Sequence, residues 1–134
     1  MKNFIFIFII LLIGCQNEHK LIMERGIQYY EWEMIEKSII EFKQVTQSLN
    51  SKLNTLDHEN IKLLSRAYHN LAIAYAKKEW YADAILEAKK AFELYPSNEN
   101  KKVLELIKNK LRTSTEPTIQ KKSTEPTIQK KVIQ

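Results

Sequence analysis

The chain has 134 residues, of which 44% are hydrophobic and 28% are charged, and its formal net charge is +5. The excess positive charge lies at the C-terminal end, where residues 112–134 contain five basic and two acidic residues. Residues 16–111 contain fifteen basic and fourteen acidic residues, so we expect no strongly basic face and no nucleic-acid partner. Only one glycine, Gly26, follows residue 14, which excludes the glycine-rich loops that bind nucleotide phosphates.

The sequence also lacks the patterns of common catalytic and metal sites. The three histidines, His19, His58 and His69, stand at no metal-ligand spacing. No serine lies in the Gly-x-Ser-x-Gly context of a hydrolase nucleophile. We therefore predict that the protein is not an enzyme and that it takes no metal, no dissociable cofactor and no small-molecule substrate.

Residues 1–14 have the composition of a signal peptide. Lys2 is followed by an unbroken apolar run over residues 4–13, and a membrane-spanning helix needs about 20 apolar residues. The run leads to Gly14 and to Cys15, the only cysteine, so no internal disulfide can form. One interpretation is that Cys15 is a plain thiol behind an ordinary signal peptide, which would leave an exported protein with an unpaired cysteine.

Residues 12–15, LIGC, resemble the lipobox of bacterial lipoproteins. In that family the signal peptide is cut before the cysteine, whose thiol carries a diacylglycerol and whose amine usually carries a further acyl chain. The resemblance implies that Cys15 is the lipidation site and that residues 15–18 form the lipidated N-terminus. Two or more acyl chains anchor a protein stably, whereas one myristoyl chain binds a membrane only marginally. The lipid anchor would hold the protein at the bacterial cell envelope.

Residues 19–111 are predicted to be all-α. No proline occurs before Pro96, good helix formers dominate, and apolar residues recur at spacings of three and four. The pattern predicts about five helices: over 19–30, from residue 33 to about 53, from 58 to about 76, over 81–95 and over 98–111. Asp57 and Ser97 are candidate N-caps, and Pro96 is expected to end the fourth helix.

Residues 112–134 are predicted to be a disordered basic tail. The nonapeptide STEPTIQKK occupies residues 114–122 and is repeated without change at 123–131. One apolar residue in each copy is too few to build a core. The tail is either a solvated extension or a basic segment that contacts anionic lipid or the cell wall.

Residues 65–98 resemble a tetratricopeptide repeat (TPR). The matching residues are, in chain order, Tyr68, Leu71, Ala72, Tyr75, Ala84, Ala91 and Pro96. The resemblance implies two antiparallel helices that approach closely where the alanines lie. Ala88 departs from the family, which often has a bulky aromatic residue there, and we expect Phe92 to fill that volume.

A second, weaker copy covers residues 19–52. Its Gly26, Tyr29, Ser38, Phe42 and Val45 keep the spacings of Ala72, Tyr75, Ala84, Ala88 and Ala91. The copies are offset by 46 residues, from Gly26 to Ala72, where an uninterrupted array gives about 34, so the helices around residues 50–61 are expected to be longer. The resemblance implies a fragment of an α-solenoid in which residues 98–111 form a capping helix.

In this family the first helix of each pair lines a groove that binds a protein or a peptide. By spacing, the groove residues would be Lys20, Met23, Ile27 and Tyr30 in the first copy and Arg66, His69, Ile73 and Lys77 in the second. They combine apolar centres with cationic edges, which suits an amphipathic or acidic-ended peptide. Alternatively, these residues are ordinary surface or pack against the connector between the copies.

A lipid-anchored protein with such repeats resembles the BamD family of outer-membrane lipoproteins. The resemblance rests on the lipobox, the helix pair after it, and the segments WYADAI at 80–85 and FELYPSN at 92–98. It implies an accessory protein in β-barrel assembly that faces the periplasm and binds the barrel-assembly membrane subunit and nascent outer-membrane proteins. Two alternatives stay open: a surface lipoprotein that binds a host or extracellular ligand, and a pilotin-like lipoprotein of a secretion or pilus system.

Overall fold

The computed structural model of the chain describes residues 18–115, which form five α-helices and one 3-10 turn. The helices are α2 (Glu18–Glu31), α3 (Ile35–Asn50), α4 (His58–Lys77), α5 (Tyr81–Leu94) and α6 (Asn98–Thr115), and the turn η2 is Leu53–Thr55. These residues contain no strand, so the predicted all-α class is confirmed. The predicted signal peptide, Cys15 and residues 116–134 of the predicted tail lie outside the described residues.

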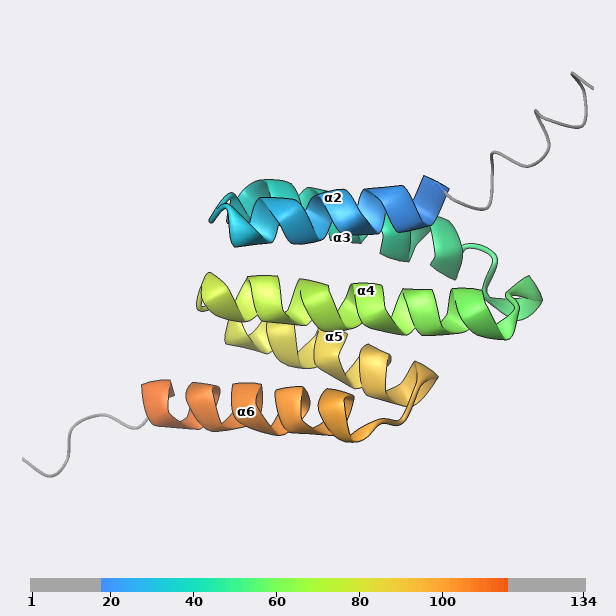
Figure 1. The fold of residues 1–134 in the computed structure, drawn as a ribbon. Coiled ribbons are helices and arrows are strands. Elements are labelled where there is room, and N and C mark those ends of the chain that lie inside the picture. The colour runs from blue at the N-terminus through green and yellow to red at the C-terminus, as the bar shows by residue number, and fades with distance from the viewer. Residues whose placement is uncertain (1–17, 116–134) are drawn as a thin grey trace, which may run out of the picture.

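The helices stack in layers (Figure 1). α2 and α3 form one antiparallel pair, α4 and α5 form a second pair beside it, and α6 packs against the second pair. The largest fully buried side chains, among them Met23, Phe42 and Leu64, lie in the core where the two pairs meet. A second, smaller cluster joins α4 and α5 to Ile107 of α6. Ile107 belongs to the same cluster as Ala88, whereas Phe92, which the sequence analysis expected beside Ala88, is not among the side chains of this cluster.

The turns inside the two pairs have the same geometry. Glu33 and Glu79, 46 residues apart, both adopt left-handed backbone angles, with φ of 58° and 63°. In the first turn Met34 N–H donates to the Tyr29 carbonyl at 2.9 Å, and in the second Trp80 N–H donates to the Tyr75 carbonyl at 3.0 Å. This is the Schellman arrangement that ends a helix. The structure thus has an internal repeat of a helix–turn–helix unit with the offset that the sequence indicated.

The two helices of each pair approach closely, but the side chains at the point of contact differ in size between the two pairs. In the first pair, a Cβ added to Gly26 would lie 2.6 Å from Cε1 of Phe42. In the second pair, Ala72 and Ala88 occupy the corresponding positions and pack in one cluster. A glycine opposite a phenylalanine and an alanine opposite an alanine both let the two backbones approach, which explains why Gly26 is required in a helix interior where glycine is otherwise costly.

Several helix ends differ from the predicted ones. The second helix begins at Ile35, not at residue 33, because the left-handed Glu33 cannot continue a helix. The connector after α3 contains the 3-10 turn, and α4 begins at His58, as predicted. α3 has 16 residues and α4 has 20, each more than the 14 of α5, so the helices on both sides of the connector are longer, as expected. Asp57 caps α4 by accepting from the Asn60 N–H at 2.8 Å, as predicted.

The last helix also ends later than predicted. α6 continues to Thr115, so residues 112–115 are helical and not part of a disordered tail. The hydroxyls of Thr113 and Ser114 donate to carbonyls of the same helix at 3.0 and 2.7 Å, and Arg112 places a positive charge in the last turn. The positive charge stabilises the carbonyl end of the helix, whereas the hydroxyls bond to carbonyls that precede the last four of the helix.

Ion pairs join the second pair of helices to the first. Lys77 Nζ lies 3.2 Å from Glu33 Oε2, and Lys78 forms a hydrogen bond with Glu36 that lowers the pKa of that carboxyl group. Exposed pairs of this kind contribute little stability. They matter here because they involve the C-terminal end of α4, where Lys77 was predicted to line a groove.

Candidate peptide-binding groove

A pocket of about 190 Å³ opens between α2 and α4. Its lining residues are Ile27, Tyr30, Phe42, Arg66, Asn70 and Ile73. Four of the eight predicted groove residues, Ile27, Tyr30, Arg66 and Ile73, are therefore brought together on one surface. The walls are mainly apolar, and Arg66 places a cationic group at the rim.

Two further pockets continue this surface, and Arg66 lines all three. One of about 330 Å³ lies toward the start of α2 and includes Lys20, Glu59 and Lys62. The other, of about 410 Å³, lies between α4 and α6. We call the three together the α4 groove. The first helices of the two pairs and the capping helix line it, which is the arrangement that a repeat stack uses to hold an extended chain.

Arg66 is well placed to contact a ligand. Its side chain is 56% exposed, and the nearest carboxylate, that of Glu24, is 3.8 Å away. An exposed pair at this distance contributes little and leaves the guanidinium free to form shorter hydrogen bonds. Lys62 at the same rim is paired equally loosely with Glu59, at 3.9 Å.

Two predicted groove residues are buried instead of exposed. Met23 is 0% exposed and belongs to the core between the helix pairs, so it forms part of the floor of the pocket toward the start of α2. His69 is 8% exposed and is hydrogen-bonded to Asn100 of α6. Both residues are more deeply buried than helical spacing predicted, yet each lines a pocket: Met23 the one toward the start of α2, and His69 the one between α4 and α6. Helical spacing does not reveal how deeply each position lies between neighbouring helices.

A third residue, Lys77, lies at the C-terminal end of α4, where it pairs with Glu33. The three pockets of the α4 groove do not include it. Lys20 is exposed and lines the pocket at the opposite end of the groove.

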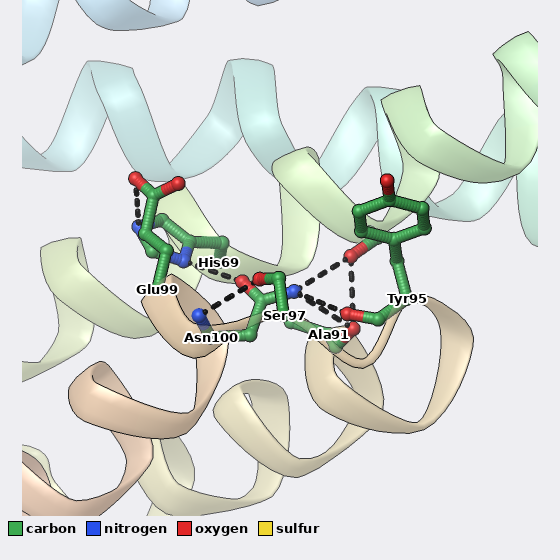
Figure 2. A network of polar contacts seen from close by, with 7 residues as sticks. His69, Ala91, Tyr95, Ser97, Glu99 and Asn100 are labelled. Carbon is green, nitrogen blue, oxygen red and sulfur yellow. Dashed lines mark hydrogen bonds and ion pairs between the residues drawn. The ribbon is translucent and has the colours of Figure 1, made fainter.

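The floor of the pocket between α4 and α6 is a network of polar contacts (Figure 2). Asn100 donates through Nδ2 to the carbonyls of Tyr95 at 2.8 Å and Ala91 at 3.2 Å, and to Ser65 Oγ at 3.1 Å. Its Oδ1 lies 2.8 Å from His69 Nδ1. Ser65 Oγ donates in turn to the Ala91 carbonyl at 2.8 Å. The network ties α4, α5 and α6 together with every buried polar atom in contact with a partner.

Sequence reasoning missed Asn70 and Asn100. Asn70 lies one turn after Arg66 on α4, so the spacing of four residues could have identified it. Asn100 gave no such signal, because a polar residue in the first turn of a helix is normally solvated. Its N–H does bond to Ser97 Oγ at 3.1 Å, which agrees with the predicted cap.

No other type of site stands out among residues 18–115. These residues contain no group of three or more histidine, cysteine or acidic side chains that could hold a metal ion. None of their helices is long and apolar enough to cross a membrane. No protein-family model matches the sequence and no curated protein matches it, so an interpretation of the α4 groove depends on its geometry.

Proposed function

We propose that the protein is a non-catalytic scaffold of TPR type that binds an extended segment of a partner protein in the α4 groove. The observation that supports this most directly is the pocket in which Ile27, Tyr30 and Ile73 from two repeat units converge beside the exposed Arg66. An apolar pocket with a few placed polar groups is the usual form of a binding site. The repeated turn geometry at Glu33 and Glu79 supports the TPR assignment.

The proposal includes a membrane anchor. Lipidation of Cys15 would leave only residues 16 and 17 before α2 begins at Glu18. Two residues span at most about 7 Å, so the helix stack would be held directly at the membrane surface. This position suits an accessory protein that meets a membrane-embedded partner, and among envelope functions we favour outer-membrane β-barrel assembly on the periplasmic side.

The first prediction concerns the groove. Replacing Ile73 with aspartate puts a charge into the apolar pocket, and because Ile73 is half-buried we expect the fold to survive. Partner binding should fall at least about tenfold, since an unpaired carboxylate in an apolar site costs more than the ~1.4 kcal/mol that this factor represents. Affinity purification from cells that make the native full chain measures the loss.

The matched control is Ile40→Asp, which makes the same change at a 63% exposed position of α3 outside the groove. The control should recover the membrane subunit of the barrel-assembly machinery as well as the wild type does. Equal recovery with Ile73→Asp would show that the groove is not the site. Recovery of only unrelated proteins by the wild type would exclude the barrel-assembly role, and protease cleavage on intact cells would favour the surface alternative.

The second prediction concerns the anchor. Cys15→Ala should abolish incorporation of labelled fatty acid and leave a precursor that retains residues 1–14, because the acylated thiol is absent. Mass spectrometry of the purified protein measures both effects. Fatty-acid labelling of the alanine variant at the wild-type level would contradict a lipid anchor at Cys15, whatever the result for Ile73.

A further inference from the structure

The orientation of the Asn100 amide is fixed by its surroundings. The carbonyls of Tyr95 and Ala91, 2.8 and 3.2 Å from Nδ2, can only accept hydrogen bonds. The amide nitrogen must therefore face them, and Oδ1 must face His69. Because Oδ1 is also only an acceptor, the His69 Nδ1 atom at 2.8 Å has to carry a hydrogen.

A neutral His69 that is protonated at Nδ1 has an unprotonated Nε2. This atom faces Glu99, whose Oε1 lies 3.9 Å away, at the wall of the 410 Å³ pocket (Figure 2). A lone pair and a carboxylate cannot hydrogen-bond to each other. His69 Nε2 and the carboxylate of Glu99, whose side chain is 82% exposed, thus present two acceptors to the pocket, and Nε2 is open to a donor from a ligand.

The same pocket also has lining residues of the opposite character. Lys62 and Arg66, which lie on α4 two turns and one turn before His69, line the pocket and carry only donors. Their positive charges disfavour a cationic ligand between His69 and Glu99. A group that has one donor and one acceptor fits this lining, and the backbone amide of a bound peptide is such a group.

We propose that the pocket between α4 and α6 binds a backbone amide, whose N–H donates to His69 Nε2 and whose carbonyl accepts from Arg66. His69 is then the residue that accepts a hydrogen bond from the main chain of the ligand. Asn100 is the positioning residue that determines the tautomer of His69. The proposal rests on the peptide-binding function above for its biological meaning. It assigns to the groove a hydrogen-bonding subsite in addition to the apolar pocket at Ile73.

The tautomer can be observed directly. Long-range proton–nitrogen NMR correlation on the full chain with ¹⁵N-labelled histidine should show His69 protonated at Nδ1 and unprotonated at Nε2 at pH 7.5. A hydrogen on Nε2 would overturn the proposal. The measurement uses the wild-type protein, so no variant needs to fold.

Two small amides then test the subsite. N-methylacetamide has one N–H and one carbonyl, and N,N-dimethylacetamide has the carbonyl alone. We expect N-methylacetamide to shift the His69 Nε2 resonance with an affinity about 2- to 10-fold higher than its dimethyl analogue, the ratio that one net hydrogen bond gives. His58, exposed on α4 and not part of this pocket, is the internal control.

Equal titration by the two amides, or equal shifts at His69 and His58, would overturn the proposal. Neither result depends on Ile73 or on a natural partner. If the amide test fails but Ile73→Asp loses partner binding as predicted, the amide subsite is rejected and the proposed function of the groove stands. If the amide test succeeds but Ile73→Asp binds the partner as well as the wild type does, the amide subsite stands and the proposed function of the groove is rejected.

Discussion

Replacing Phe42 with alanine is expected to lower the free energy of unfolding by about 3–5 kcal/mol, the usual cost of truncating a buried phenylalanine. Phe42 is the largest of the fully buried side chains and lies where α3 meets α2. A small domain has about 5–15 kcal/mol of stability, so this change removes a large part of it. Denaturant unfolding followed by circular dichroism measures the loss, and Phe92→Ala on the half-buried side of α5 is the control.

The contact between Gly26 and Phe42 predicts that the effect of Gly26→Ala on stability changes sign when Phe42 is removed. In the wild type, Gly26→Ala should destabilise the protein by about 1–3 kcal/mol, because the new methyl group would lie 2.6 Å from the buried Phe42 ring. In the Phe42→Ala background the closest contact left is Glu41 Cβ at 3.0 Å, which can move by a few tenths of an ångström into the space of the removed ring. Gly26→Ala should then stabilise by up to about 1 kcal/mol, since alanine is the better helix former. The same sign in both backgrounds would show that the ring does not impose the glycine.

The second large effect is expected at Asn100. Asn100→Ala leaves the Tyr95 carbonyl and His69 Nδ1 without their partner, and each buried orphan costs about 1–3 kcal/mol, so we expect a loss of about 3 kcal/mol. The exposed Asn109 of α6 provides the control, and Asn109→Ala should change stability by less than about 0.5 kcal/mol. Thermal and denaturant unfolding measure both variants.

A third variant at the same position tests the orientation of the amide. Asn100→Asp at pH 7 would direct a carboxylate oxygen at the Tyr95 and Ala91 carbonyls, where the amide nitrogen now donates. It should therefore destabilise at least as much as alanine does, although its shape is almost unchanged. An aspartate variant as stable as the wild type would mean that the amide is oriented the other way.

The sequence predicted the helices well where local chemistry decides the structure. Asp57 and Ser97 cap α4 and α6, and α5 ends at Leu94 because the residue before Pro96 is driven out of helical geometry. The 46-residue offset was visible in the spacing of Gly26 and Ala72. The left-handed Glu33 was not predicted, because a non-glycine residue in that conformation gives no compositional signal.

The α4 groove was predictable only in part, because the burial of its residues depends on contacts between helices. Ile27 and Ile73 lie where helical spacing places them, at the junction of α2 and α4. Met23 and His69 have the same spacing but are buried, Met23 in the core between the helix pairs and His69 against Asn100 of α6. Burial of this kind results from contacts between residues far apart in sequence, such as His69 with Asn100, and a periodic pattern in one helix carries no information about them.

The layered order of the helices also bears on how the chain acquires its structure. Each helix packs chiefly against its sequence neighbours, α2 on α3, α3 on α4, α4 on α5 and α5 on α6. Such a topology needs only short loops to close before favourable contacts form, and helical proteins of this kind fold in microseconds to milliseconds. A chain delivered unfolded to a membrane surface would then spend little time with its apolar faces exposed to aggregation.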